Sequence, residues 1–240
     1  MKPIIIAQGL IISIFLLLPT LLKAPNDAYY TDCVIPKKDI PQGQIIVGIN
    51  TLNPQRTKDN RAFQKRGKKL AKQLGYGYTE ITSGQGLLST LEQLSSKSGM
   101  LGNVIIIAHG DSLGMFFDTD QGLYDDKVLT RRYWKRFYGL KGKKALLSEW
   151  VNAFNDRKIR FHPKAQQLWL TCSGGKIAEK ISRKTGLNIL ACTGQVAPIN
   201  TPDATAETGY YTSVGNFYRF EGGEKVNLGD LFSPYDYLHR

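Results

Sequence analysis

The stretch NVIIIAHGDSLG, residues 103–114, begins with a continuous apolar run and ends with residues that favour turns. An apolar run without polar alternation is typical of a strand buried on both faces, as in a parallel sheet. It predicts a strand at 103–110, and similar runs predict strands at 44–50, 78–82, 165–172 and 187–194. Helical patterns separate them, at 57–75, 86–99, 149–159 and 176–186. This alternation predicts an α/β fold, a three-layer sandwich around a mainly parallel sheet.

The composition fits one folded domain and gives only a weak indication of a partner. The chain has 240 residues, of which 42% are apolar and 22% charged, enough to bury one core. Its formal net charge of +12 suits an anionic partner but carries no information on the fold. No cluster of His, Cys and Asp has the spacing of a zinc site, and we expect neither a metal nor another cofactor.

The N-terminal stretch differs from the rest of the chain. Residues 3–22 carry no charge, and about 20 apolar residues are enough to cross a bilayer as a helix. We therefore expect a transmembrane anchor or signal segment at 1–23, a linker at 24–43 and the α/β domain at 44–240. The absence of a clear cleavage pattern favours an uncleaved anchor. The domain is expected to be membrane-anchored or exported and to lie outside the cytoplasm.

Three further segments have distinct compositions. Residues 115–145 are polar, aromatic and basic and are interpreted as a surface excursion. Aromatic residues alternate around Gly222 and Gly223 in the segment 209–232, and this pattern predicts a C-terminal β-hairpin. Within the excursion, 131–144 interleaves aromatic and basic residues and suits anionic lipid or an acidic partner; nucleic acid is not expected. The basic stretch at 56–72 is interpreted as a solvated helix face.

Two chemically reactive side chains end neighbouring strands of the predicted sheet. His109 ends the strand at 103–110, and Cys172 ends the strand at 165–172. The carboxyl ends of parallel strands share one edge, so we expect the imidazole and the thiol to meet there, as a base and a nucleophile require. The sequence SGG follows Cys172 and leads into a helix, whose N-terminus stabilises a thiolate. Gly110 has no side chain, so its N–H can approach a substrate carbonyl.

IIIAHG followed by LWLTCSGG resembles the caspase and gingipain clan of cysteine peptidases, including the caspase-like domains of bacterial toxins. The similarity covers roughly residues 44–200. It implies a caspase-like topology, a peptide or protein substrate, and peptide-bond cleavage or autoprocessing. By this resemblance His109 is the general base or acid, Cys172 is the nucleophile, and the N–H groups of Gly110 and Cys172 are the oxyanion donors. The SGG after Cys172 departs from the caspase pattern, and no specificity pocket is recognisable.

Two alternatives remain beside the peptidase. Gly110, Asp111, Ser112 and Leu113 spell the motif of GDSL-type serine esterases, and Asp236 with His239 has the spacing of that family's Asp-x-x-His pair. Against this interpretation, two complete strand–helix units precede the motif, and the expected Gly-x-Asn-Asp block is missing. The other alternative is a catalytically inactive caspase-like module that binds a partner through 115–145. Of the remaining cysteines, Cys192 lies inside an apolar run and is interpreted as a core residue.

Overall fold

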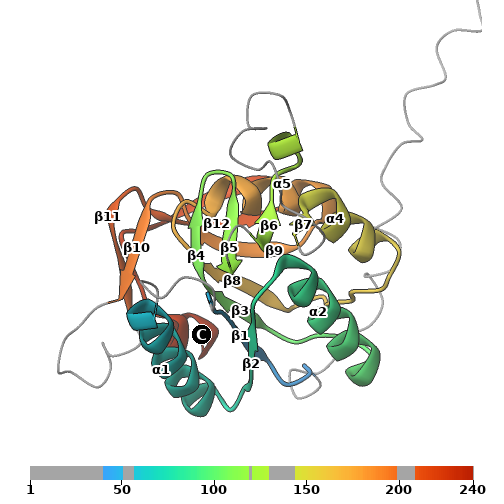
Figure 1. Cartoon of the computed structure of the whole chain (residues 1–240), viewed down its shortest axis with the longest axis horizontal. Helices are drawn as coiled ribbons and strands as arrows, with labels where there is room; N and C mark the ends of the chain where they lie inside the picture. Colours follow the sequence, from blue (N-terminus) through green and yellow to red (C-terminus); the bar gives the residue numbers. More distant parts are fainter. Residues whose placement is uncertain (1–39, 51–56, 119–120, 130–143, 199–208, 240) are drawn as a thin grey trace, which may run out of the picture. The chain divides into compact units, whose positions relative to one another are not determined.

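The structure is a computed structural model that describes residues 40–50, 57–118, 121–129, 144–198 and 209–239 (Figure 1). These residues belong to one compact unit, Lys38–Arg240. The expected anchor at 1–23, most of the linker and the aromatic and basic stretch at 131–143 lie outside the described residues. Within the described ranges, no helix is long and apolar enough to cross a membrane.

A seven-stranded sheet forms the centre of the fold, with the order β13-β12-β9-β8-β3-β1-β2. Five of these strands run parallel, as the apolar runs predict, and β12 and β13 add antiparallel strands at one edge. The α/β class with a mostly parallel sheet is therefore confirmed. The strands are β1 (Gln44–Gly48), β2 (Gly77–Ile81), β3 (Val104–Ile107), β8 (Gln166–Leu170), β9 (Asn188–Cys192), β12 (Phe217–Glu221) and β13 (Glu224–Gly229).

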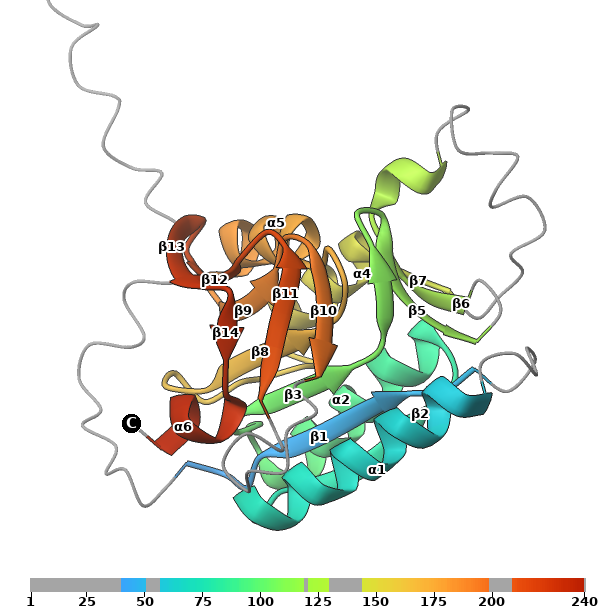
Figure 2. The same ribbon diagram turned by 90° about the vertical axis from the view of Figure 1, so that its left-hand side faces the viewer.

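Helices pack on both faces of this sheet (Figures 1 and 2). Alternate residues of the central strands contribute to two separate apolar clusters, one with α1 and the C-terminal residues and the other with α2, α4 and α5. Both clusters contain side chains of β3, which is why its sequence is apolar throughout. The helices are α1 (Thr57–Leu74), α2 (Gly84–Ser98), α4 (Leu147–Asn155), α5 (Gly175–Thr185) and α6 (Pro234–His239).

The strand order fixes where a ligand would bind. After β1 the chain adds β2 on one side, then crosses to the other side and adds β3, β8 and β9 in sequence. The direction of the crossovers therefore reverses between β1 and β3. In open sheets of this kind, ligands bind outside the carboxyl ends of the strands near this reversal. The carboxyl ends of β1 and β3 flank this reversal, and β8 is the next strand beyond β3.

Two small sheets stand near these strand ends. One contains β4 (His109–Asp111), β5 (Gly114–Asp118), β6 (Gln121–Tyr124) and β7 (Ala145–Leu146). A short 3-10 helix, Asp126–Leu129, lies between β6 and β7 in the sequence. The other contains β10 (Gln195–Pro198), β11 (Tyr210–Val214) and β14 (Leu231–Phe232). In both views the β10–β11 pair lies beside the β4–β5 hairpin (Figures 1 and 2).

The interpretation of 115–145 as a surface excursion is wrong for its described residues. Met115, Phe117, Leu123 and Tyr124 are all buried, because β6 packs against α2, β5 packs against β1, and both strands contribute to the apolar clusters. Each of these strands is short and irregularly paired, so neither gives the polar–apolar alternation by which a strand is recognised in a sequence.

Candidate active site

His109 and Cys172 follow two hydrogen-bonded parallel strands at corresponding positions. Ile107 of β3 pairs with Leu170 of β8, and His109 and Cys172 each come two residues later. Adjacent strands lie about 4.8 Å apart. A Cβ atom added to Gly110 would lie 2.9 Å from the carbonyl oxygen of Cys172, so the two chain segments remain in contact after the strands end. The structure thus brings the two predicted residues to one edge of the sheet.

Both side chains belong to the α1 face of the sheet. Ile107 and Leu170, two residues before them, pack into the cluster that contains α1 residues, and side chains two apart along a strand share a face. The contacts of His109 and Cys172 agree with this placement. His109 contacts Phe63 of α1, and Cys172 contacts Val196 of β10; both partners pack against that same cluster.

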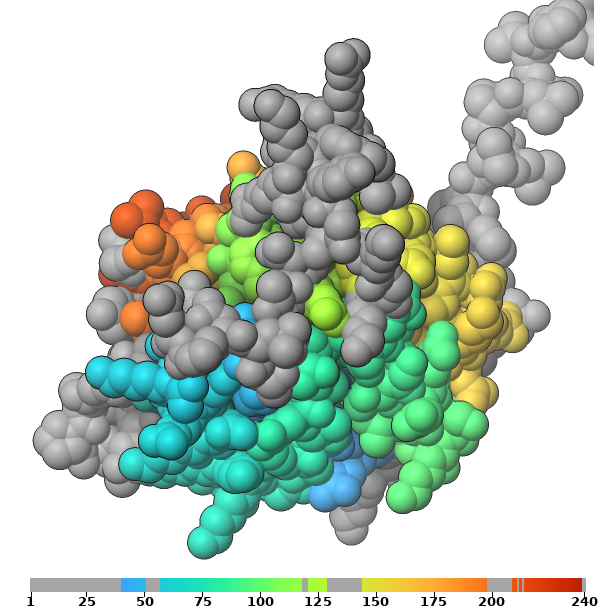
Figure 3. All heavy atoms as spheres, viewed as in Figure 1, coloured from blue at the N-terminus to red at the C-terminus, as the bar shows by residue number. Residues whose placement is uncertain are grey.

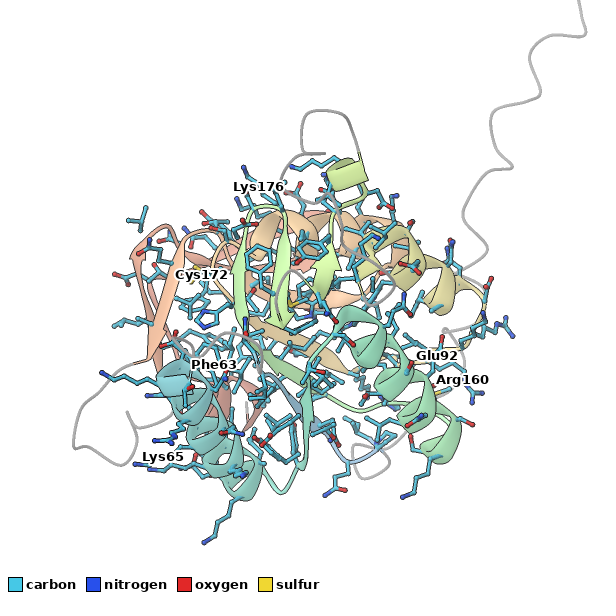
Figure 4. All side chains as sticks on the ribbon, viewed as in Figure 1. Phe63, Lys65, Glu92, Arg160, Cys172 and Lys176 are labelled. Carbon is cyan, nitrogen blue, oxygen red and sulfur yellow. The ribbon has the colours of Figure 1, made fainter. Side chains whose placement is uncertain are left out.

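The imidazole of His109 is held by α1. Its Nε2 atom lies 3.3 Å from Oδ2 of Asp59, and its ring centre lies 4.8 Å from that of Phe63, with an angle of 50° between the planes. The His109 side chain is 28% exposed, which leaves part of the imidazole accessible. Figure 4 shows Phe63 on the side of α1 nearer to Cys172. A carboxylate at this position orients the imidazole.

Cys172 lies in a tight turn between β8 and α5. The next residue, Ser173, has φ +53°, a left-handed conformation that non-glycine residues seldom adopt. A side chain at Gly174 would collide with Oγ1 of Thr171, so the turn is closely packed. Sharp strand-to-helix turns of this kind present a nucleophile at the end of a sheet. The SGG sequence therefore forms the tight turn itself, in addition to preceding helix α5.

The sulfur of Cys172 contacts the backbone of β10. The Val196 N–H donates to Sγ at 3.4 Å, and the Val196 carbonyl oxygen lies 3.8 Å from Sγ, within reach of the thiol proton. This contact places the sulfur against β10 at the end of the sheet. Cys172 is half-buried and is a free cysteine.

Cys192 differs from Cys172 in exposure, although each sulfur accepts a hydrogen bond from a backbone N–H. It is fully buried in β9, as predicted for a core residue, and its Sγ accepts a hydrogen bond from the Gly194 N–H at 3.1 Å. Burial raises the pKa of the Cys192 thiol, the nearby Cys172 adds to the increase, and the Gly194 hydrogen bond opposes it. Cys192 is therefore an internal reference thiol for experiments on Cys172.

Gly110 is tightly enclosed. An added Cβ atom would also lie 3.1 Å from the carbonyl oxygen of Gly114 and 3.2 Å from Cβ of Thr171. A side chain would push apart the β4–β5 hairpin and the turn that carries Cys172. This packing explains why glycine is required at position 110; its assignment, with that of Cys172, as an oxyanion donor stays a prediction.

The structure does not bring the three esterase residues together. Ser112 occupies the two-residue turn between β4 and β5, and Asp236 is exposed on α6. His239 is the last residue of α6. Figure 2 shows α6 and the β4–β5 hairpin at different ends of the fold. Ser112 and Leu113 have a simpler role, since the carboxylate of Asp111 accepts a hydrogen bond from the Leu113 N–H at 2.6 Å and closes the turn.

The sequence pattern does not predict the contacts that Asp59, Phe63 and Val196 make at the site. One signal for Asp59 was present, because it is the only acidic residue in an otherwise basic helix. Its contact with His109 joins positions 50 residues apart and depends on how α1 packs, which the spacing of residues does not reveal. Comparison of the sequence with models of known families gives no match, and comparison with curated proteins gives none either.

Proposed function

We propose that residues 44–240 form a caspase-like cysteine peptidase domain, membrane-tethered or exported, that cleaves peptide bonds in a protein substrate or in its own chain. The observation that carries the proposal is the corresponding position of His109 and Cys172 at the ends of two paired parallel strands, on one face of the sheet. The caspase-like topology, with a three-layer arrangement and a C-terminal hairpin, is part of the proposal.

In the proposed reaction, His109 takes the proton of the Cys172 thiol through Nδ1, the ring nitrogen remote from Asp59. The sulfur turns from Val196 and attacks the scissile carbonyl carbon, and the carbonyl oxygen becomes an oxyanion. The N–H groups of Gly110 and Cys172 are assigned to stabilise it. The protonated imidazole then gives its proton to the departing amine as the C–N bond breaks. This leaves a thioester between the substrate acyl group and Cys172.

Hydrolysis of the thioester completes the cycle. His109 takes a proton from a water molecule, the resulting hydroxide attacks the thioester carbonyl, and the thiolate leaves and recovers a proton from the imidazolium. Asp59 acts as a positioning residue, because its carboxylate contacts His109 Nε2 and not the reacting atoms. It stabilises the imidazolium formed in both halves of the reaction.

The test is covalent labelling of the full chain by a set of peptides that carry an electrophilic ketone at the C-terminus. Labelled sites are identified by mass spectrometry. We expect modification of Cys172 that is lost in Cys172→Ala and strongly reduced in His109→Ala. Cys192→Ala is the matched control and should label like the unaltered chain, because that thiol is buried.

Self-cleavage provides a second measurement. If the chain processes itself, the fragments should be absent in Cys172→Ala and present in Cys192→Ala. Absence of labelling in all folded variants, or labelling of Cys172 that is independent of His109, would instead favour a catalytically inactive module. Thermal melting monitored by circular dichroism establishes that each variant is folded.

A further inference from the structure

The outward face of α1 carries a continuous row of positive charge. Lys58, Arg61, Lys65, Lys68 and Lys72 are all exposed and recur at alternating intervals of three and four residues. This spacing places all five on one side of a helix, over a length of about 21 Å. We call these residues the basic row. Figure 3 shows side chains of α1 projecting from the margin of the molecule, and Figure 4 shows Lys65 and Phe63 on different sides of the helix.

The basic row is poorly neutralised by the rest of the described structure. Lys68 pairs with Glu80, at 3.8 Å, and stands 5.5 Å from the centre of the Tyr78 ring. Within the described part of the chain, no ion pair is found for Lys58, Arg61, Lys65 or Lys72. By contrast, two of the cations on α5, Lys180 and Arg183, pair with carboxylates.

This arrangement costs stability in the isolated domain. Like charges three and four residues apart on a helix repel one another, by about 0.2–0.5 kcal/mol per pair. Lys58 and Arg61 also lie near the N-terminus of α1, the positive end of the helix dipole. Repulsion along the basic row opposes folding and is offset in the described structure by a carboxylate only at Lys68. Such a feature indicates that the row serves binding and not stability. An anionic surface would remove the repulsion along the whole row.

The neighbouring sequence favours a bilayer as that surface. The uncharged apolar stretch at 3–22 ends 35 positions before Thr57 and is expected to hold the chain at a membrane. In the described part of the chain an aromatic ring, that of Tyr78, lies beside Lys68 of the basic row, whereas proteins that bind single-stranded nucleic acid interleave several aromatic rings with their cations. Binding through charge alone is typical of basic segments on anionic lipid headgroups.

We propose that α1 docks onto anionic phospholipid headgroups through Lys58, Arg61, Lys65 and Lys72. The opposite side of the same helix carries Asp59 and Phe63, which contact His109, so docking leaves these contacts in place. The proposal is independent of catalysis and holds for an active peptidase and an inactive module alike.

The test uses the full chain inserted into nanodiscs of neutral phosphatidylcholine, so that the apolar segment is already in lipid. Vesicles with about 30 mol% phosphatidylglycerol are then added, and binding of the nanodiscs is measured by sedimentation. We expect binding to these vesicles, none to neutral vesicles, and loss of binding at about 0.5 M salt, where charge interactions are screened.

Charge reversal identifies the surface. Each cation near an anionic bilayer contributes on the order of fivefold to binding, so replacing Lys58, Arg61, Lys65 and Lys72 by Glu should weaken vesicle binding at least a hundredfold. The matched control replaces Lys97, Lys158, Lys164 and Lys184, which are exposed elsewhere on the domain, by Glu and changes the net charge equally. It should retain most of the binding.

Two results would overturn the proposal. The first is equal loss of vesicle binding in the two variants, which would assign the effect to net charge. The second is that the chain binds duplex DNA or polyglutamate more tightly than vesicles, and that only charge reversal of the basic row abolishes this binding. That result would assign the surface to nucleic acid or to an acidic protein. Reversal leaves like charges at 58, 61 and 65, but it creates opposite-charge neighbours for Lys68 and places acidic groups at the positive end of the helix dipole. The row variant should therefore melt no lower than the unaltered chain in the absence of vesicles, so misfolding is readily recognised.

Discussion

At the scale of single residues, the candidate site depends on a few side chains that are held by different elements. Asp59 and Phe63 reach His109 from α1, and the backbone of Val196 reaches Cys172 from β10. In the structure, therefore, each reactive group has its own support. The two supports differ in kind, since one is a carboxylate beside an imidazole and the other is a backbone N–H beside a sulfur atom.

Replacing Asp59 by Asn should slow alkylation of Cys172 by an electrophilic peptide roughly tenfold, because the carboxylate no longer stabilises the protonated imidazole. The rate is measured by mass spectrometry as a function of probe concentration. Asp156→Asn is the matched control, since Asp156 is an exposed carboxylate on another helix end. A rate in Asp59→Asn equal to that of the control would remove Asp59 from the mechanism.

The protein should be more stable with glycine at position 173 than with alanine there. At φ +53° a Cβ atom is strained, and a left-handed residue other than glycine costs roughly 1–2 kcal/mol. We expect the free energy of unfolding, measured with urea, to be about 1 kcal/mol higher for Ser173→Gly than for Ser173→Ala. An equal stability of the two variants would show that the turn after Cys172 is relaxed in solution.

At the scale of elements, the position of α1 determines where Asp59 and Phe63 lie. The helix approaches β1 closely at Gly67, where an added Cβ atom would lie 2.6 Å from Cγ2 of Val47 and 3.0 Å from Cε2 of Tyr78. Glycine is needed at position 67 because there is no space for a side chain. An unusual backbone conformation is not the reason. The site is therefore sensitive to changes at residues that do not touch it.

Gly67→Ala tests this coupling. The extra methyl group should displace α1 and lower the free energy of unfolding by about 1–3 kcal/mol, the usual cost of overpacking. Because Asp59 and Phe63 move with the helix, alkylation of Cys172 should also slow. Gln73→Ala, on the exposed side of α1, is the control and should change neither quantity. Reduced stability with an unchanged alkylation rate would mean that α1 does not position His109.

Asp125 links the sheet that carries His109 to the helix that follows Cys172. Its carboxylate accepts hydrogen bonds from the side chain of Lys180 on α5 and from the backbone N–H of Lys127. Burial alone raises the pKa of Asp125, but these hydrogen bonds and the charges of both lysines outweigh it, so the pKa lies below its ordinary value of 3.8. The charged form of Asp125 therefore stabilises the fold.

A carboxylate with a lowered pKa contributes its full stability above the ordinary value of 3.8 and loses it as the pH falls through the lowered pKa. Asp125→Asn should reduce the free energy of unfolding by about 1–2 kcal/mol at neutral pH. The difference from the unaltered chain should shrink as the solution is acidified below the ordinary pKa. Urea titrations at several pH values measure it; a difference that is constant with pH would contradict the assignment.

Much of this organisation follows from sequence, for reasons that particular elements make clear. The strands β1, β3, β8 and β9 are apolar runs bounded by turn residues, and the helices between them begin or end at signals such as Ser83 and Gly186. The order of these elements predicts that the residues after β3 and β8 lie near one another. The strands β4 to β7 were missed because their burial comes from packing on distant elements. The same reason applies to Asp59.

At the scale of the whole molecule, three features have different physical origins. The parallel sheet places His109 and Cys172 at one edge, α1 contacts His109 with one side, and the basic row on its other side is proposed to bind anionic lipid. The candidate site and the proposed docking surface lie on opposite sides of one helix. A peptidase of this design would meet its substrates close to a membrane.

Cys172 and His109 are proposed to act as one reactive unit. This proposal is tested most directly by the rate at which a small reagent, iodoacetamide, alkylates Cys172 near neutral pH in the unaltered chain and in His109→Ala, with Cys192 as the internal reference thiol. We expect Cys172 to react at least about tenfold faster in the unaltered chain than in His109→Ala, because the imidazole takes the thiol proton. Equal rates in two equally folded chains would contradict the claim.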